Sequence, residues 1–151
     1  MRGSARLLNL PPVKLSVKSD YAARAVLGLA RHYPTGAAVK VDELAAEYGI
    51  PPNFLVQILI ELKAKRLVTS VRGKEGGYLL AKAPAEISLG EVIRAIHGQV
   101  FDTPALGDSQ CPPELLKCWR NLQATLDAAA DDIDFQRLTE AAAEKEKMYY
   151  I

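Results

Sequence analysis

Histidine and cysteine, which often carry out catalysis or hold metal ions, are scarce in this sequence. Its 151 residues include two of each. No segment resembles a Ser/His/Asp set, a metal-hydrolase helix motif or a nucleotide-binding glycine loop. The sequence therefore contains no recognisable set of catalytic residues, and we expect that the protein is not an enzyme.

Long apolar runs are also absent. No stretch of the sequence is long enough to cross a bilayer, and the first residues lack the apolar region and cleavage site of a secretory signal. We therefore expect a cytoplasmic protein without a membrane partner. Two cysteines in that compartment are expected to be thiols or metal ligands rather than a structural disulfide.

The chain as a whole has no large excess of positive or negative charge, because its formal net charge is only +1. The charges are nevertheless unevenly placed. Residues 14–86 contain eleven Lys and Arg against seven Asp and Glu, whereas residues 87–151 contain six against eleven. This asymmetry predicts that the first part of the chain binds nucleic acid. The hydrophobic content of 49% suffices for one core with an appendage.

A basic, glycine-rich turn at residues 71–80 is flanked by strand-forming residues, and helical patterns precede it. Apolar spacing predicts helices capped by Ser19 and Asp42, and Gly49 provides the turn into the next helix. The expected elements are helices at 19–32, 43–48 and 51–66, then strands at 67–72 and 78–82. This order predicts a mainly α chain with a winged helix-turn-helix and a two-stranded β wing, whose last helix enters the major groove of DNA.

The second half of the sequence is expected to form a dimer. A helix at 88–97 begins with Ser88 and has Glu91 in position to complete a capping box. A long loop at 99–112 follows. Between residues 113 and 133 apolar residues recur at a three-then-four spacing, typical of a helix that packs on a twin, and a terminal helix is expected at 135–148. The predicted dimerisation residues are Leu115, Trp119, Leu122, Leu126, Ala129 and Ile133.

Several short segments together resemble the Rrf-two family of bacterial transcription regulators. They are KLS at 14–16, DYAARA at 20–25, GIP at 49–51, FLVQIL at 54–59, SVRG at 70–73, GGYLL at 76–80 and ISLGEVI at 87–93. The family includes the iron-sulfur cluster regulator, the nitric-oxide-sensing repressor and the cysteine-metabolism repressor. The resemblance implies a homodimer that binds a pseudo-palindromic operator, and we expect a repressor.

The chain is accordingly expected to contain four parts. Residues 1–13 form an N-terminal extension, and residues 14–86 form the winged helix-turn-helix DNA-binding domain. Residues 87–112 form a linking helix and a sensor loop, where a small-molecule or redox effector is expected to act. Residues 113–151 form the dimerisation helix and the terminal helix.

Arg72 is the strongest candidate for a DNA contact, since a narrow A·T minor groove attracts a guanidinium group. Asn53 and Gln57 are expected to bond to base edges, because amides pair with adenine; the alternative is an ordinary polar face. Phe54 either contacts DNA or packs in the core. Val56 stands where the family often carries an acidic residue. Other expected contacts, with a solvated face as the alternative, are Lys18, Tyr21, Arg24, Lys40, Gly73, Lys74, Gly76, Gly77 and Tyr78.

The cysteines depart from the pattern of the family, many of whose members hold an iron-sulfur cluster with three cysteines. Cys111 looks like the last of these, while Ala105 and its neighbours supply no thiol. Cys118 falls within the apolar stripe and is expected to be a buried small hydrophobe. On one helix the two cysteines would be about 10 Å apart, too far for a disulfide.

An iron-sulfur cluster in this chain would need ligands other than cysteine. The candidates beside Cys111 and Cys118 are Asp20, which occupies the carboxylate position of some family members, and His97, with surface or packing roles as the alternative for the histidine. Two readings therefore stay open beside the DNA-binding repressor. One is an iron-sulfur or thiol redox sensor, and the other is an interaction module that has lost DNA binding.

Overall fold

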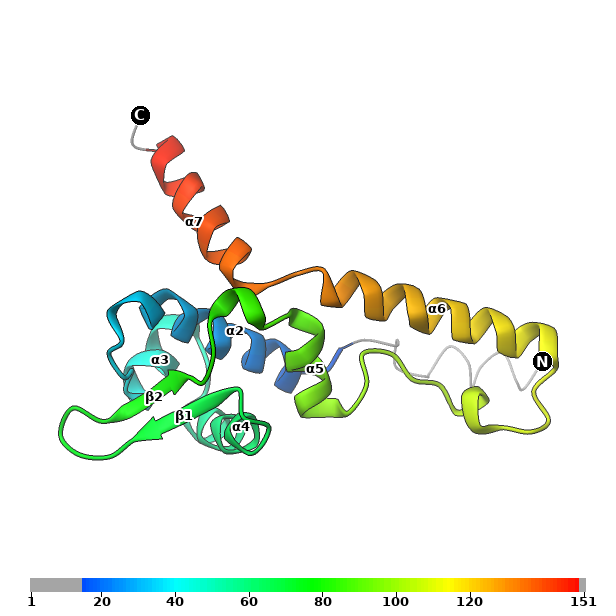
Figure 1. The fold of residues 1–151 in the computed structure, drawn as a ribbon. Coiled ribbons are helices and arrows are strands. Elements are labelled where there is room, and N and C mark those ends of the chain that lie inside the picture. The colour runs from blue at the N-terminus through cyan, green and yellow to red at the C-terminus, as the bar shows by residue number, and fades with distance from the viewer. Residues whose placement is uncertain (1–14, 150–151) are drawn as a thin grey trace, which may run out of the picture.

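The computed structural model describes residues 15–149, so the predicted extension at 1–13 lies outside the described residues. The chain is mainly helical and has one two-stranded antiparallel sheet (Figure 1). In chain order the elements are α2 (Val17–His32), the 3-10 helix η1 (Tyr33–Thr35), α3 (Val41–Tyr48), α4 (Pro52–Ala64), β1 (Val68–Val71), β2 (Gly77–Leu80), η2 (Pro84–Glu86), α5 (Leu89–His97), η3 (Pro104–Gly107), α6 (Pro113–Asp131) and α7 (Phe135–Tyr149). None of the described helices is long and apolar enough to span a membrane.

One hydrophobic core lies among α2, α3, α4 and α5, where apolar residues spaced by three and four face inward. Its fully buried members come from each of these helices and from the wing, and include Val26, Leu44, Leu55, Ile58, Leu59, Leu62, Leu67, Val68 and Val92. Phe135, the first residue of α7, is also buried in it. Its backbone N–H donates to the Ile87 carbonyl oxygen at 3.1 Å. The terminal helix is therefore attached to the core at its first residue.

Two predicted helix caps are wrong. Helix α2 begins earlier than expected, and its cap is Ser16, whose Oγ accepts a hydrogen bond from the Ser19 N–H at 3.1 Å. Either serine can cap a helix, but Ser19 is buried within α2. Helix α3 is preceded by Lys40, which makes no side-chain cap, and Asp42 lies in the first turn. There its carboxylate is close to the positive end of the helix dipole.

The helix-turn-helix and the wing are confirmed, with shorter elements than predicted. Gly49 ends α3 in the left-handed conformation, at φ 66°. Helix α4 stops at residue 64 rather than 66, because the chain turns at Arg66, which has a φ of 61°. The strands pair from Val68 with Leu80 to Val71 with Gly77.

The segment before α3 adds a third extended piece to the wing. The N–H of Val39 donates to the Tyr78 carbonyl oxygen and the N–H of Tyr78 donates to the Val39 carbonyl oxygen, both at 2.9 Å. The sequence predicted only a short extended link there. Because this bridge holds Val39 extended, α3 begins directly after Lys40.

The second half begins as predicted with α5, which Ser88 caps through a bond from the Glu91 N–H at 3.1 Å and Gly98 ends. The Glu91 carboxylate, however, accepts from Lys82 at 2.6 Å, so the reciprocal half of the predicted capping box is wrong. Helix α6 ends two residues earlier than predicted, at Asp131, since the Ile133 carbonyl accepts a hydrogen bond from the Leu89 N–H at 2.8 Å.

Candidate nucleic-acid interface

Helix α4 has two contrasting faces. Leu55, Ile58, Leu59 and Leu62 are fully buried on one face. The other face is exposed along its length and carries Asn53, Val56, Gln57 and Ile60, which follow each other at intervals of three, one and three residues. We call these four residues the outer face of α4. It meets no other part of the described chain closely enough to be buried, so it is free to enter a groove.

A shallow hollow lies at the start of α4, beside α2. It has a volume of about 250 Å³ and is lined by Lys18, Asn53, Phe54 and Gln57, all predicted to bind DNA. Phe54 is 49% exposed, which makes its core alternative wrong. Its ring meets the edge of the Tyr21 ring, with 6.0 Å between the centroids. The predicted contacts of α2 and α4 are thus brought together.

The wing places Arg72, Gly73 and Lys74 in exposed positions between the two strands. The N–H of Gly76 donates to the Gly73 carbonyl oxygen at 3.0 Å, and that of Tyr78 is used in the bridge to Val39. The N–H groups of these two residues are therefore already bonded within the chain and are not free to bind a phosphate. The groups of the turn that can bind a phosphate are therefore the cationic side chains of Arg72 and Lys74.

Unpaired positive charge gathers on this half of the molecule. Six of the exposed cations that make no ion pair within the described chain lie at the end of α4, on the wing or next to Val39, and they are Lys40, Lys63, Lys65, Arg66, Arg72 and Lys74. Lys63 is held in place by a hydrogen bond from its Nζ to Ser70 Oγ at 2.7 Å, which joins the end of α4 to β1. In Figure 1, α4 and the wing lie together along the lower side of the molecule.

Two other predicted cations have partners inside the chain. Lys18 forms an ion pair with Glu61 at 2.7 Å, which joins α2 to α4. Arg24 pairs with Asp20 at 2.8 Å and also lies over the Tyr21 ring, 5.6 Å from its centroid. Their contacts with phosphate stay a prediction, and the structure gives both residues a role in packing as well.

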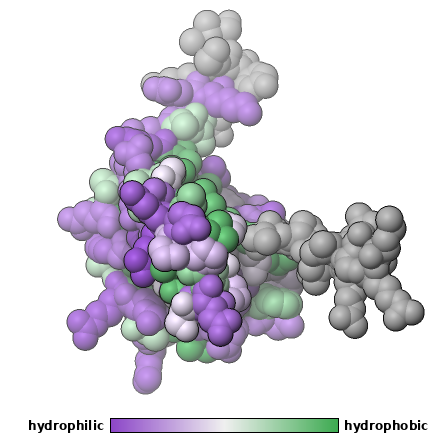
Figure 2. Space-filling model, turned by 90° about the vertical axis from the view of Figure 1, so that its right-hand side faces the viewer, coloured by the Kyte–Doolittle hydropathy of each residue, from purple (hydrophilic) through white to green (hydrophobic). Residues whose placement is uncertain are grey.

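Helix α6 packs on its own chain with one face and exposes another. Its half-buried or buried residues are Leu116, Trp119, Gln123, Asp127 and Ala130. The exposed stripe contains Leu115 at 44%, Leu122 at 42% and Leu126 at 38%, and Ile133 continues it at 39%. Ala129 is exposed beside this stripe. Figure 2, which looks at the molecule from the end where α6 begins, shows a column of hydrophobic surface bordered by hydrophilic surface.

Two residues of α6 differ from their predicted surroundings. Trp119 stacks on Phe101 of its own chain, with 6.5 Å between the ring centroids. It therefore packs chiefly on the inward face of α6, and its part in a dimer interface stays a prediction. Cys118 is exposed, so the prediction of a buried hydrophobe is wrong for this single chain.

A set of charged residues that the sequence reasoning missed connects α5 to α6. Arg94 of α5 forms ion pairs with both Asp127, at 3.3 Å, and Asp131 of α6. The two aspartates are four residues apart and so share one side of the helix. The four-residue spacing of the aspartates is visible in the sequence, but it does not show that Arg94 lies opposite them. Gln123 of α6 adds a hydrogen bond to the Phe101 carbonyl oxygen at 3.1 Å.

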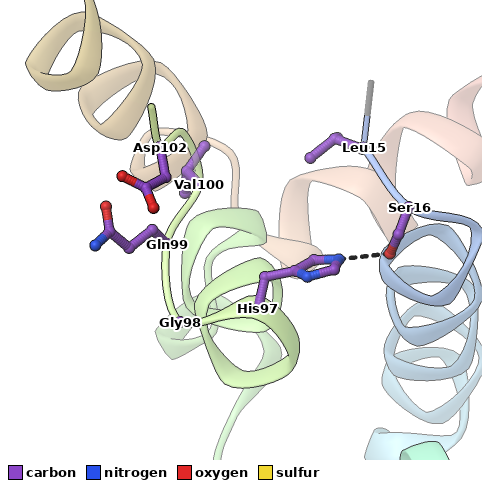
Figure 3. A pocket seen from close by; sticks show the side chains of 7 residues that line it. All are labelled: Leu15, Ser16, His97, Gly98, Gln99, Val100 and Asp102. Atoms are coloured by element: carbon purple, nitrogen blue, oxygen red, sulfur yellow. Dashed lines mark hydrogen bonds between the residues drawn. The ribbon is translucent and has the colours of Figure 1, made fainter. Parts of the chain in front are cut away.

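The residues considered for an iron-sulfur cluster do not fit one within a single chain. No group of three or more His, Cys, Asp or Glu residues placed to hold a metal ion occurs in residues 15–149. His97 lies in a hollow beside Asp102 that contains no thiol, and its ring bonds to Ser16 Oγ (Figure 3). Asp20 is paired with Arg24. Cys111 and Cys118 are both free thiols.

Residues 15–141 match the family model Rrf2, described as an iron-dependent transcriptional regulator. The chain belongs to the Rrf2 (Rrf-two) family. This match spans the helix-turn-helix, the wing, the linking helix and α6, so the architecture described above is that of a known kind of DNA-binding regulator. The protein is a DNA-binding transcriptional regulator and not an enzyme.

Individual Rrf2 relatives agree with this assignment. A Mycobacterium tuberculosis protein named as an HTH-type transcriptional regulator is 41% identical over 125 residues, which cover 80% of this chain and 77% of that protein. The HTH-type transcriptional regulator IscR of Klebsiella pneumoniae is 34% identical over 131 residues, covering 83% and 79%. The solved structure of T. potens IscR matches with a TM-score of 0.72 at 28% identity, covering 91% and 97%.

Proposed function

We propose that the protein is a homodimeric repressor that binds a pseudo-palindromic operator. Residues 14–86 act as the DNA-binding domain, 87–112 as the linking helix and sensor loop, and 113–151 as the dimerisation part. In each subunit α4 lies in the major groove and the wing reaches the adjacent minor groove. The observation that carries the proposal is the placement of the outer face of α4 and the unpaired cations on one side of the molecule.

The contacts with DNA divide into positioning and reading. Phosphates attract the unpaired cations, because each neutralised phosphate releases a counterion. Asn53 and Gln57 on the outer face of α4 have amide groups that match the adenine edge. Arg72 is exposed at the wing and carries the planar guanidinium that a narrow minor groove attracts.

The exposed stripe of α6 supports a dimer. Leu115, Leu122 and Leu126 lie along one exposed stripe of a helix whose other face packs on its own chain, and an unpaired apolar stripe suits a second α6. A two-fold dimer requires two matching half-sites in the DNA. Repression follows when such an operator overlaps a promoter and the bound dimer excludes the polymerase.

Titration of fluorescent promoter DNA from the protein's own operon region, at several salt concentrations, tests this function. A repressor of this kind gives saturable binding, one dimer per operator by light scattering, and a steep loss of affinity with salt. Promoter reporter activity then falls when the protein is expressed. A monomer in solution, or the absence of salt-sensitive binding to any promoter fragment, would contradict the proposal.

A second candidate function is thiol or iron sensing at the loop between α5 and α6. The family description as iron-dependent favours it, as do the free thiols of Cys111, at the end of this loop, and of Cys118, on α6. Since a single chain does not assemble the ligands of a cluster, iron would need ligands from the second subunit. Iron content and visible absorbance after anaerobic purification decide between a cluster and free thiols.

A further inference from the structure

We infer that Val56 and Ile60 read thymine, by contacting its C5-methyl group in the major groove, so that A·T pairs lie beneath the middle of α4 in each half-site. The inference rests on the proposed function, which places α4 in that groove. It adds the identity of the bases and the residues that select them.

The exposure of these two side chains is the first observation. Val56 is 45% exposed and Ile60 is 51% exposed, although α4 buries four other aliphatic residues completely. They lie four residues apart and therefore form one small apolar patch on the outer face of α4. A side chain without polar atoms cannot hydrogen bond to a base or a phosphate. The apolar group that the major groove displays is the thymine methyl.

The lack of guanine and cytosine readers on α4 is the second observation. Guanine is most often read by arginine or lysine, and cytosine by a carboxylate. Within α4, all of which is described, the only cation is Lys63, which is bonded to Ser70 at the end of the helix. The only carboxylate is Glu61, which is paired with Lys18. Amides and aliphatic groups remain, and these match adenine and thymine.

The surroundings of α4 favour DNA over a second copy of the chain as the partner of this patch. In Figure 1, α4 lies on the lower side of the molecule, whereas α6 with its apolar stripe extends along the upper side. Unpaired cations lie at the end of α4 and on the wing, which is next to α4 (Figure 1). That charge suits the phosphates on either side of a groove and does not suit an apolar protein surface.

The test replaces thymine by uracil, which removes the methyl group and leaves base pairing unchanged. Duplexes are first selected from a random-sequence library with the full-length protein, and each thymine of the selected half-site is then replaced in turn. We expect about a fourfold loss of affinity for each methyl group contacted, from the burial of one methyl-sized apolar group. Fluorescence anisotropy at fixed salt measures it.

Variants assign the effect to a residue. Val56→Ala is expected to weaken binding to the thymine duplex and to bind the thymine and uracil duplexes about equally. Val71→Ala is the matched control, because Val71 is 44% exposed but belongs to the wing. The minor groove displays no methyl group, so this variant should keep the wild-type ratio between the two duplexes. Thermal melting checks that each variant is folded.

The outcomes separate this inference from the proposed function. Failure to recover any duplex would overturn both. The selected duplexes could bind in a salt-sensitive way and yet tolerate uracil at every thymine, or place G·C pairs beneath α4. Either result would overturn the reading of thymine and leave the proposed regulator intact. The reading of thymine would also be overturned if Val56→Ala and Ile60→Ala both kept the wild-type ratio of affinities for the thymine and uracil duplexes.

Discussion

Gly77 lies so close to Val39 that a Cβ atom on the glycine would stand 2.3 Å from the Val39 carbonyl oxygen. This contact accompanies the two hydrogen bonds between Val39 and Tyr78. It closes the base of the wing against the segment that leads into α3. The glycine is therefore required for packing, whether or not its backbone also approaches DNA.

Replacing Gly77 with alanine should destabilise the protein. The added methyl group meets backbone atoms, which cannot rotate away, so we expect a loss of about 1–3 kcal/mol in the free energy of unfolding. Urea denaturation measures it. Gly107→Ala is the control, since a Cβ there meets nothing within 4 Å. Equal stability of the two variants would show that the wing base can shift without cost.

Replacing Arg72 with alanine should weaken DNA binding and leave stability unchanged, because the side chain is exposed and unpaired. If it contacts phosphates or the minor groove, the slope of log affinity against log salt should fall by about 0.9 for each arginine removed. Lys145→Ala removes the same charge from α7, which projects away from the wing (Figure 1). A loss of affinity of the same size in both variants would contradict a specific role for Arg72.

A charge on the α6 stripe should dissociate the proposed dimer. Leu122→Glu places a carboxylate where the second helix would pack, at a cost of about 3 kcal/mol or more for an unpaired buried charge. Sedimentation velocity measures the fraction of dimer, and operator binding should fall with it. Ala124→Glu is the matched control because residue 124 is exposed on the side of α6 opposite to the stripe. Dimers that survive Leu122→Glu would assign the interface to another surface.

Removing Arg94 should loosen the connection between the DNA-binding domain and α6. The three charged side chains are 35–46% exposed, so we expect less than about 1 kcal/mol of lost stability. The dimer should persist, but affinity for the operator should fall by about 0.5–2 kcal/mol because the spacing between the two reading helices is less fixed. Operators with altered half-site spacing provide the readout. A variant that keeps the wild-type spacing preference would exclude this role.

Protein purified without oxygen should contain free thiols and no stoichiometric cluster. The prediction follows from the placement of Asp20 and His97, each bonded to another residue rather than grouped with a thiol. Thiol titration, iron analysis and visible absorbance measure it. We expect Cys111→Ser to bind the operator as the wild type does. One cluster per subunit, lost in Cys111→Ser, would instead show that the dimer completes a ligand set.

The sequence alone was enough to predict the succession of helices, the wing and the family. The helices and the wing follow from local rules, since apolar spacing, Gly49 and the glycine-rich turn each act within a few residues of the chain. The family followed from the resemblance of several short segments. The same apolar spacing determines which aliphatic residues of α4 share its buried face, whereas Phe54 projects from the helix toward Tyr21.

Only the tertiary structure decided the contacts between residues far apart in the chain. It selected Ser16 over Ser19 as a cap, placed Trp119 on Phe101, and set Arg94 opposite two aspartates. It also left Val56 and Ile60 exposed on a helix that is otherwise rich in buried aliphatic residues. The physical reason is that helical spacing determines which residues share a face, whereas the packing of the whole chain determines what that face meets.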